Sequence, residues 1–377
     1  MLCERAQPSP EGYPVFEHNP RFWRLAEAAE RPGGPERAPL VVLSWLYCGA
    51  LSAYLAPYRL GVRKPNRIST PVVSVGNLVL GGTGKTPVVR WLCESLIADG
   101  VRPCVVSYGY GGSACSSPTV VSDGSTVRLS AAEAGDEPAM LARLLPTVPV
   151  VVGKRRFTAA SLAEERFSPD LVVLDDGFQH WQLHRDLDIV VLDARRPFGN
   201  GRTIPAGPMR EPKSALRRAD VVIISHSDAV DEQSLAALRQ EIEVLSPGSG
   251  IYRARYADAT ARPLNGSGGA PDGATVCALS SIGAPSGFEK IAATGFALAC
   301  AVRYPDHHPY TSEDLDQVVQ AARRSGASAI VTTEKDAVRW PASQNALPVS
   351  VLDVCLRMDS GRELLERVRD LLVSHGA

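Results

Sequence analysis

Short runs of β-branched residues alternate with helical patterns from residue 70 onward, and this alternation limits the folds open to the chain. The runs are almost continuously apolar, as in DLVVLDD and ADVVIISHS, whereas a strand with one exposed face would alternate apolar and polar residues. Stretches such as PVVRWLCESLIADG between them have helical spacing. The sequence therefore predicts an α/β fold with an open, doubly wound parallel sheet, covered by helices on both faces.

The overall charge gives no reason to expect a polyanionic partner. The 377 residues contain 40 basic and 41 acidic side chains, for a formal net charge of -1. Attraction to nucleic acid or to an anionic membrane needs a basic excess, so any anion recognition must be local. The 8 cysteines show no CxxC pair, which favours reduced thiols in the cytosol. We expect no nucleic-acid partner and infer no obligate protein partner.

An uncharged apolar segment covers residues 38–58, between Arg37 and a basic cluster of Arg59, Arg63 and Lys64. It is long enough to cross a bilayer core of about 30 Å. The basic cluster predicts that the following chain stays cytoplasmic. We expect a membrane-associated helix that binds membrane lipid. Whether it spans the membrane or lies in the interface stays open, and a buried core helix is the alternative.

Composition also predicts the domain organisation. Residues 1–37 are rich in Pro, Glu and Arg and are expected to form a weakly ordered polar extension before the membrane-associated helix at 38–62. A phosphate-loop domain is expected over 63–246. A Gly/Pro/Ser-rich tract at 262–276 interrupts the α/β pattern, so a second, smaller α/β domain is expected over 247–377.

The stretch SVGNLVLGGTGKTPVVRW, residues 74–91, places a glycine-rich loop between a predicted strand and a predicted helix. Backbone N–H groups of such a loop converge on phosphate oxygens, Lys85 would neutralise phosphate charge, and the Thr86 hydroxyl would ligate Mg²⁺. Val79 stands where the strict GxxxxGK[ST] pattern has glycine, so a glycine turn with an incidental lysine is the alternative. The candidate nucleotide-binding residues are Gly81, Gly82, Thr83, Gly84, Lys85 and Thr86.

The stretch LVVLDDGFQH is an apolar strand that ends in two carboxylates. Phosphate-loop enzymes need an acid at such a strand end to hold Mg²⁺, and Asp175 is the better placed, with Asp176 next. The alternative is a pair of ordinary turn residues. Loop and acidic strand end together indicate nucleotide hydrolysis or phosphoryl transfer, without choosing between them.

Several longer motifs resemble one family, the tetraacyldisaccharide 4'-kinases, which phosphorylate a lipid A precursor on the cytoplasmic face of the Gram-negative inner membrane. The matching stretches are TPVVSVGNLVLGGTGKTPVV, GYGG, AGDEP, DDGFQH, RDLDIVVLDA, GNGRTIPAGPMREP, PDHHPYT and TTEKDAVR. They occur in the family's order over roughly residues 40 to 340. The family's phosphate loop also lacks the first glycine, so Val79 agrees with the resemblance.

The resemblance implies a reaction and its catalytic groups. It implies that ATP with Mg²⁺ phosphorylates the 4' hydroxyl of a tetraacyldisaccharide 1-phosphate, the lipid substrate, at that membrane face. The implied base is Asp136 paired with His307, with Lys85 on the phosphates. Taken alone, Asp136 is more typical of a helix N-cap, and DHH of a polar loop in which Thr311 or Ser312 caps the next helix. Asp136 and His307 belong to different predicted domains, so their meeting implies a site in the cleft, which closure around ligand would complete.

Further polar residues are candidates for contacts with phosphate or acceptor. They are Asn77, Arg156, Gln179, His180, Arg202 and Arg210. Two positions depart from the family pattern: Tyr108 replaces the arginine of SRGYG, and Ala284 replaces the asparagine of GIGNP. These departures concern acceptor binding rather than the metal, the base or the phosphate loop.

Two other functions are compatible with a phosphate loop. One is a membrane-attached ATPase that acts as a switch or assembly factor; the guanine-specifying NKxD motif is absent, and SHSD at 225–228 lacks its Asn and Lys. The other is a nonenzymatic descendant, which is disfavoured because every proposed catalytic position is filled.

Overall fold

The computed structural model describes residues 7–18, 38–264, 268–341 and 346–376. The chain divides into two compact units. The larger unit comprises Glu30–Tyr256 and Leu356–Ala377, and the smaller unit comprises Met1–Ala29 and Ala257–Cys355. The chain therefore passes from one unit to the other within β10 and again within β14.

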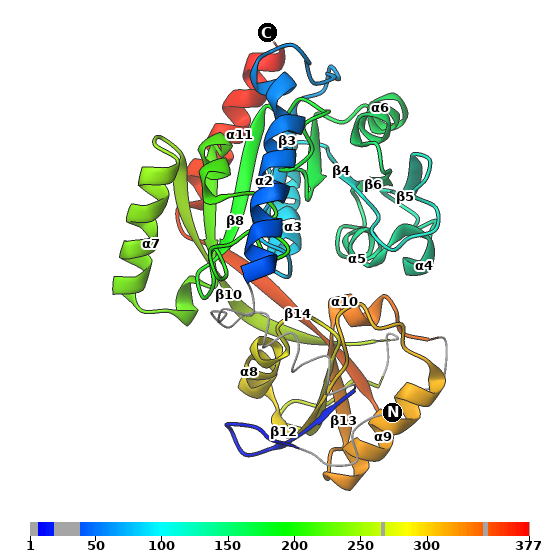
Figure 1. Cartoon of the computed structure of the whole chain (residues 1–377). Helices are drawn as coiled ribbons and strands as arrows, with labels where there is room; N and C mark the ends of the chain where they lie inside the picture. The colour runs from blue at the N-terminus through cyan, green and yellow to red at the C-terminus, as the bar shows by residue number, and fades with distance from the viewer. Residues whose placement is uncertain (1–6, 19–37, 265–267, 342–345, 377) are drawn as a thin grey trace. The chain divides into compact units, whose positions relative to one another are not determined.

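A mostly parallel sheet forms the centre of the larger unit (Figure 1). Its strand order is β10-β9-β8-β3-β7-β4-β6-β5, and only β5 and β6 pair antiparallel. Both faces of β3, β7, β8 and β9 are buried, which explains their continuous apolar runs. The α/β prediction is confirmed. The bounds are β3 (Val72–Gly76), β4 (Pro103–Ser107), β5 (Thr119–Asp123), β6 (Pro149–Val152), β7 (Leu171–Asp175), β8 (Leu187–Asp193), β9 (Val221–Ser225) and β10 (Gly250–Pro263).

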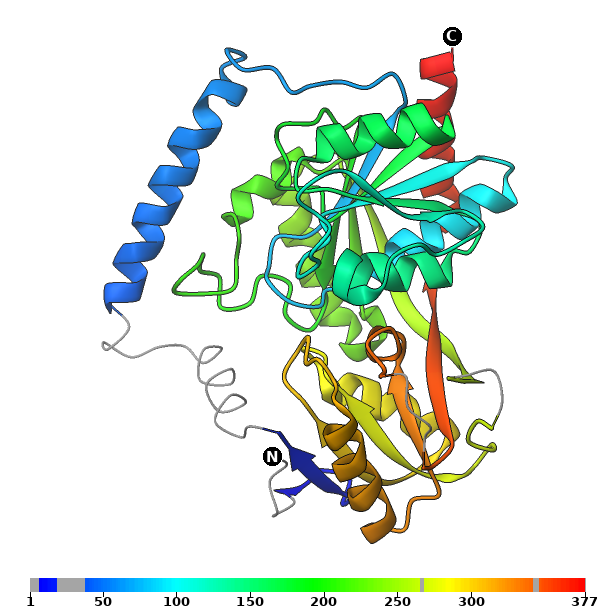
Figure 2. The same cartoon turned by 90° about the vertical axis from the view of Figure 1, so that its right-hand side faces the viewer.

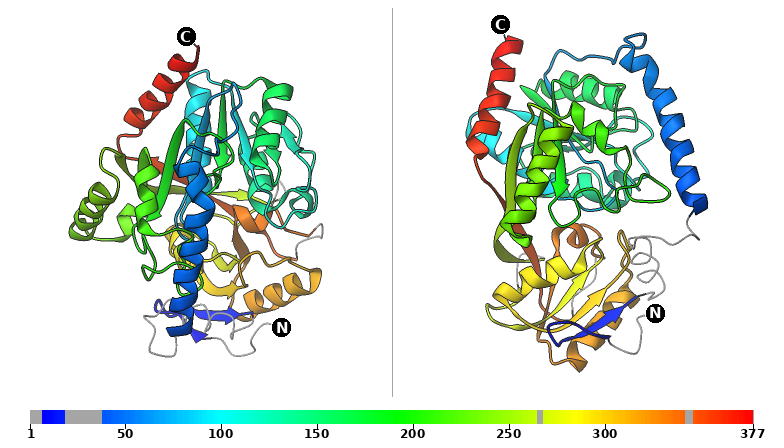
Figure 3. Two further views of the ribbon diagram at one scale, coloured as in Figure 1. Left: turned by 45° about the horizontal axis from the view of Figure 1, so that its top comes forward. Right: turned by 60° about the vertical axis from the view of Figure 1, so that its left-hand side comes forward.

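Helices cover both faces of this sheet. Leu235, Leu238 and Ile242 of α7 pack on β8 and β9, and the alanines of α6 pack on β4 and β7. Figure 3 shows α3 and the C-terminal α11 on the other side of the sheet from α7. The helices of this unit are α2 (Ala38–Arg59), α3 (Lys85–Ala98), α4 (Ala131–Ala134), α5 (Asp136–Leu144), α6 (Arg156–Phe167), η2 (Lys213–Arg218), η3 (Ser227–Ala229), α7 (Glu232–Leu245) and α11 (Gly361–Gly376).

The strands of the smaller unit follow the order β1-β2-β12-β11-β13-β14. All pairs are parallel except β1 with β2. Thr311 caps α9, because its hydroxyl accepts the Asp314 N–H at 3.2 Å, so the predicted cap is confirmed. The elements are β1 (Gln7–Pro8), β2 (Pro14–Glu17), β11 (Thr275–Ser280), α8 (Pro285–Gly295), β12 (Ala297–Arg303), α9 (Ser312–Arg324), β13 (Ala329–Thr333), α10 (Glu334–Ala337) and β14 (Val349–Met358).

The expectation of a weakly ordered N-terminal extension is wrong for residues 7–18. Here β2 adds a parallel strand to β12, with Val15 buried against the core and opposite Ala301. The Tyr13 hydroxyl donates to Glu289 at 2.7 Å, and the His18 ring stacks on Tyr304. The sequence does not predict this strand, because so short an apolar run shows no periodicity and its partner strand is distant in the sequence. Residues 19–37 of the predicted extension lie outside the described residues.

The apolar segment forms α2, the one helix among the described residues that is long and apolar enough to cross a membrane. Only 11% of its most apolar window is buried. Figure 2 shows α2 running along one side of the larger unit. One edge of the helix is polar: Ser44 donates to the Thr203 carbonyl at 2.7 Å, and Tyr47 donates to the Arg210 carbonyl at 2.7 Å. Large side chains on the other positions, such as Trp45 and Leu46, are exposed.

The compact units differ in extent from the predicted domains. Residues 356–376 belong to the larger unit, where α11 lies beside α3 and Arg369 forms an ion pair with Asp99. Residues 7–18 belong to the smaller unit. The functional domain bounds remain a prediction, since compactness alone does not define them.

Candidate functional site

The glycine-rich loop joins the end of β3 to the start of α3, as the sequence predicted. Gly81 and Gly84 have φ angles of 105° and 87°, which lie in the left-handed region that favours glycine. A Cβ atom on Gly84 would lie 2.4 Å from the Tyr256 hydroxyl oxygen. The loop conformation therefore depends on these glycines. Lys85 and Thr86 occupy the first positions of α3, and both are buried.

Val79 is a core residue, which explains why the strict phosphate-loop glycine is absent. It is 5% exposed, packs in a cluster with Phe178 and Phe198, and forms an antiparallel bridge with Met209. The bridge is extended by Arg210, whose N–H donates to the Leu78 carbonyl at 2.8 Å. The start of the loop thus pairs with the MREP segment, and a glycine here would remove the buried side chain.

Asn77 and Gln179 connect the loop to the DDGFQH segment. The Asn77 amide donates to the Thr83 hydroxyl at 2.9 Å, and the Gln179 amide donates to the Asn77 carbonyl at 2.9 Å. The Gln179 carbonyl oxygen accepts from Arg210 at 3.2 Å. Both residues therefore brace the site, and contact with a ligand remains a prediction for them.

Asp175 ends β7 with its side chain fully buried. The Ser107 hydroxyl donates to its Oδ2 at 3.0 Å, while Oδ1 has no hydrogen-bond partner among the described residues. Burial, followed by the charges of Glu137 and Asp176, raises the pKa of Asp175 to about 7. A buried carboxylate with an unpartnered oxygen, and with Glu137 and Asp176 close enough to act on its pKa, is suited to a cation.

Asp176 has the opposite surroundings. Its Oδ1 lies 3.6 Å from Lys85 Nζ, and its Oδ2 accepts from Arg210 at 2.7 Å. Burial would raise the pKa of Asp176, but Lys85 and Arg210 outweigh it and hold the pKa below its ordinary value. The two neighbouring carboxylates therefore differ: Asp176 forms ion pairs with Lys85 and Arg210, whereas Asp175 forms no ion pair among the described residues.

Arg156 is buried beneath the same strand end. It donates to the Asp175 carbonyl at 3.4 Å, and its guanidinium lies 5.1 Å from the centre of the Tyr108 ring. Burial lowers the pKa of Arg156. Tyr108, which stands where the family pattern has arginine, thus supplies an aromatic face to this cation.

His180 also lies near Arg156. Burial, followed by the charges of Arg156 and Arg185, lowers the pKa of His180 to about 4, so its ring is neutral at pH 7.

The GDEP motif lies at the start of α5. Gly135 is the N-cap and Asp136 is the first helical residue, so the alternative in which Asp136 caps the helix is wrong. The charge of the next residue, Glu137, raises the pKa of Asp175, which places the start of α5 near the strand end. Sequence reasoning missed Glu137 as a contributor to the site, although the motif contains it.

Arg202 and Arg210 belong to the GNGRTIPAGPMREP segment but have different surroundings. Arg210 points to Asp176 and Gln179. The Arg202 side chain is exposed, and its carbonyl accepts from the Met209 N–H at 3.1 Å. The phosphate contact expected of Arg202 remains a prediction.

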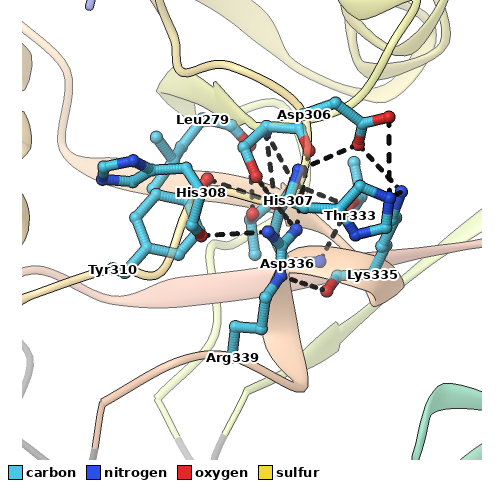
Figure 4. Close-up of polar contacts among 11 residues, drawn as sticks. Leu279, Asp306, His307, His308, Tyr310, Thr333, Lys335, Asp336 and Arg339 are labelled. Carbon is cyan, nitrogen blue, oxygen red and sulfur yellow. Dashed lines mark hydrogen bonds and ion pairs between the residues drawn. The ribbon is translucent and has the colours of Figure 1, made fainter. Parts of the chain in front are cut away.

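His307 lies in the smaller unit, on the loop between β12 and α9 (Figure 4). Lys335 Nζ lies 3.1 Å from its Nε2 and donates to Asp306 at 2.8 Å. Asp306 also accepts the His307 backbone N–H at 3.0 Å. Sequence reasoning included Lys335 in the motif TTEKDAVR without assigning it a role.

A buried carboxylate holds this loop in place. Asp336 is fully buried and accepts from Ser281 at 2.7 Å, Thr333 at 2.7 Å and Arg339 at 2.8 Å. Arg339 also donates to the His308 carbonyl at 2.9 Å. The SIGAP, PDHHPYT and TTEKDAVR segments are therefore joined through one ion pair (Figure 4).

The larger unit thus brings most of the predicted residues to one end of its sheet. Asp136 belongs to this unit and His307 to the smaller one, so their pairing remains a prediction. Among the described residues there is no group of three or more His, Cys, Asp or Glu side chains placed to hold a metal ion. A metal there would need ligands besides these side chains, such as hydroxyls, water or phosphate oxygens.

Comparison with known proteins identifies relatives of the whole chain. A family model described as tetraacyldisaccharide-1-P 4'-kinase matches residues 37–372. The chain is similar to the tetraacyldisaccharide 4'-kinase of Anaeromyxobacter sp. (strain K), with 42% identity over 93% of each chain. It is 39% identical to that of Geobacter sulfurreducens, over 85% of this chain and 90% of the relative.

A solved structure agrees with these sequence relatives. It is a crystal structure of LpxK from Aquifex aeolicus in complex with ATP. It is similar to this chain with a TM-score of 0.72 and 28% identity, over 89% of this chain and 99% of that one.

Proposed function

Because the chain belongs to the tetraacyldisaccharide-1-P 4'-kinase family and acts as such a kinase in lipid A biosynthesis, we propose that the loop at residues 81–86 binds the ATP phosphates. The observation that carries this proposal is the position of Lys85, which lies 3.6 Å from Asp176 at the end of the acidic strand. The ammonium has three donors, so it can bind phosphate oxygens while Asp176 continues to orient it. Arg210 and Arg156 are near enough to neutralise charge on the transferring group.

Asp175 and Thr86 fit a Mg²⁺ ion that accompanies the nucleotide. Asp175 Oδ1, which has no hydrogen-bond partner among the described residues, would supply the anionic ligand, and the buried Thr86 hydroxyl would supply a neutral one. When bound, the cation neutralises phosphate charge. Asp176, which the sequence suggested as a second ligand, instead holds Lys85 and Arg210 in position.

Asp136 acts as the base that accepts the proton of the 4' hydroxyl, with His307 as its partner. Its place at the start of α5, next to Glu137, supports a position near the reacting phosphate. A carboxylate can take up this proton as the hydroxyl attacks phosphorus. The pairing with His307 follows from the family motifs alone.

The kinase acts at the cytoplasmic face of the Gram-negative inner membrane, where α2 lies in the interface. Ser44, Tyr47 and Leu55 face the larger unit, while Trp45, Leu46 and Tyr54 are exposed to lipid. A helix that keeps polar contacts with its own protein along one edge cannot be surrounded by acyl chains. Alkaline carbonate should therefore release the enzyme from membranes, whereas retention would indicate a spanning helix.

The proposal is tested with the purified full chain, labelled ATP, Mg²⁺ and the lipid disaccharide. We expect label on the lipid only when the acceptor is present, and at least a hundred-fold loss of transfer in Asp136→Ala, as is typical for loss of a general base (about 10²-fold or more). Asp370→Ala, an exposed substitution on α11 of the same unit, is the control. Full transfer by Asp136→Ala would refute the base, and acceptor-independent ATP hydrolysis without labelled lipid would refute the kinase reaction.

A further inference from the structure

Lys335 contacts both side chains of the Asp306–His307 pair. Its Nζ lies 2.8 Å from Asp306 Oδ1 and 3.1 Å from His307 Nε2, with the side chain largely buried (Figure 4). The Lys335 ammonium forms an ion pair with the Asp306 carboxylate. An ammonium group has three donors and no acceptor, so the contact with His307 has only one direction.

The direction of that hydrogen bond determines the tautomer of His307. To accept from Lys335, Nε2 must present its lone pair, and the proton of the neutral ring must then be on Nδ1. Asp306 does not compete for Nε2, because its Oδ2 lies 3.8 Å away, beyond hydrogen-bond distance. We propose that Lys335 is a positioning residue that fixes His307 as the Nδ1–H tautomer.

The backbone around this contact supports a fixed geometry. His307 has a φ angle of 62°, which lies in the left-handed region. This conformation is energetically unfavourable for a residue that has a Cβ atom. Its N–H is held by Asp306 Oδ1, the same oxygen that accepts from Lys335. Lys335 itself lies on α10 between the N-cap Thr333 and the buried Asp336. His307 and Lys335 are therefore each held in position by contacts with neighbouring residues.

The catalytic consequence rests on the proposed function. A neutral imidazole can orient a carboxylate only by donating a hydrogen bond to it. In the proposed pair, with Nε2 accepting from Lys335, Nδ1–H is the group that would donate to the Asp136 carboxylate. Without the lysine, the ring can adopt the other tautomer, in which Nδ1 is an acceptor and would repel the carboxylate.

Nitrogen NMR tests the tautomer directly. The full chain is labelled with ¹⁵N-histidine, and His307 is assigned by the signal lost in His307→Gln. Long-range ¹H–¹⁵N correlations near neutral pH should show a protonated Nδ1 in the wild type and in Lys335→Arg. Lys335→Met should shift the ring toward the Nε2–H form. Lys290→Met, which removes an exposed lysine from α8 of the same unit, should leave the signal unchanged.

The result does not depend on the kinase assay. An Nε2–H signal in the wild type, or an unchanged Nδ1–H signal in folded Lys335→Met, would overturn the role of Lys335. If Lys335→Met does not fold, the wild-type signal alone decides. A correct tautomer in a protein that does not phosphorylate the lipid would refute the proposed function and leave this inference standing. In the active enzyme, Lys335→Met should lower kcat by tenfold or more with KM for ATP unchanged, and Lys335→Arg should restore most of the rate.

Discussion

The Tyr47 hydroxyl of α2 donates a 2.7 Å hydrogen bond to the carbonyl of Arg210, whose guanidinium holds Asp176. The apolar helix is therefore attached, through one residue, to the strand end where phosphate is expected. Ser44 strengthens the attachment, because its hydroxyl donates to the Thr203 carbonyl and accepts the Ala206 N–H. We therefore expect the polar edge of α2 to contribute to the geometry of the site as well as to attachment.

Removal of that hydroxyl should lower the rate without releasing the enzyme from membranes. A neutral hydrogen bond contributes about 1 kcal/mol, so Tyr47→Phe should reduce kcat roughly five-fold. Tyr54→Phe is the matched control, because Tyr54 lies half exposed on the same helix. Vesicle sedimentation and lipid phosphorylation are measured on both variants. Equal kcat values for the two would show that Tyr47 does not position Arg210.

Asp175 and Asp176 should differ in their dependence on Mg²⁺. Asp175→Asn keeps the shape of the side chain and removes the anionic ligand, so we expect the Mg²⁺ concentration for half-maximal transfer to rise by tenfold or more. Asp176→Asn should chiefly weaken ATP binding, because Lys85 and Arg210 lose their shared partner. Mg²⁺ titrations of transfer and a fluorescent ATP analogue measure the two effects. Identical Mg²⁺ curves for Asp175→Asn and wild type would exclude Asp175 as a ligand.

The stability of the metal-free protein should depend on pH through Asp175. Its pKa rises from an ordinary 3.8 to about 7 on folding, so folding favours the neutral carboxyl. Its contribution to stability is complete below pH 3.8 and is lost as pH rises through about 7. Asp175→Asn should therefore gain stability relative to wild type between pH 5 and 8, by on the order of a few kcal/mol.

Thermal unfolding without Mg²⁺ measures this difference across the pH range. Asp370→Asn, on the exposed side of α11, should follow the wild type throughout. A constant gap between Asp175→Asn and wild type would contradict the raised pKa. Added Mg²⁺ and ATP should reverse the effect, because they stabilise the charged form.

Gly76 should not tolerate a side chain. A Cβ atom there would lie 2.5 Å from Phe178 Cβ, and both residues belong to segments that bear site residues. Overpacking of this kind costs about 1–3 kcal/mol, so Gly76→Ala should lower the melting temperature. Gly295→Ala, where a Cβ would meet nothing within 4 Å, is the control. Equal melting temperatures for Gly76→Ala and Gly295→Ala would mean that β3 and Phe178 can move apart without loss of stability.

The structural features that could be predicted from the sequence are those determined by residues close together in the chain. The glycines of the phosphate loop, the apolar run before Asp175 and the Thr311 cap each act within a few residues, and the structure has them where expected. The reason that valine replaces glycine at position 79 could not be predicted, because its partner Met209 is distant in the sequence. The same holds for Lys335 with His307 and for Ser107 with Asp175. Such contacts arise from the fold, and a single sequence contains no sign of them.

The position of β2 in the sequence has a consequence for synthesis on the ribosome. Residues 14–17 are translated early, whereas their partner strand β12 is translated only at residues 297–303. Loop closure over the intervening residues 18–300 must precede this pairing. During elongation the edge of the smaller sheet stays open while α2 and the rest of the larger unit up to Tyr256 are already made. The strand β2 is therefore translated early and placed late.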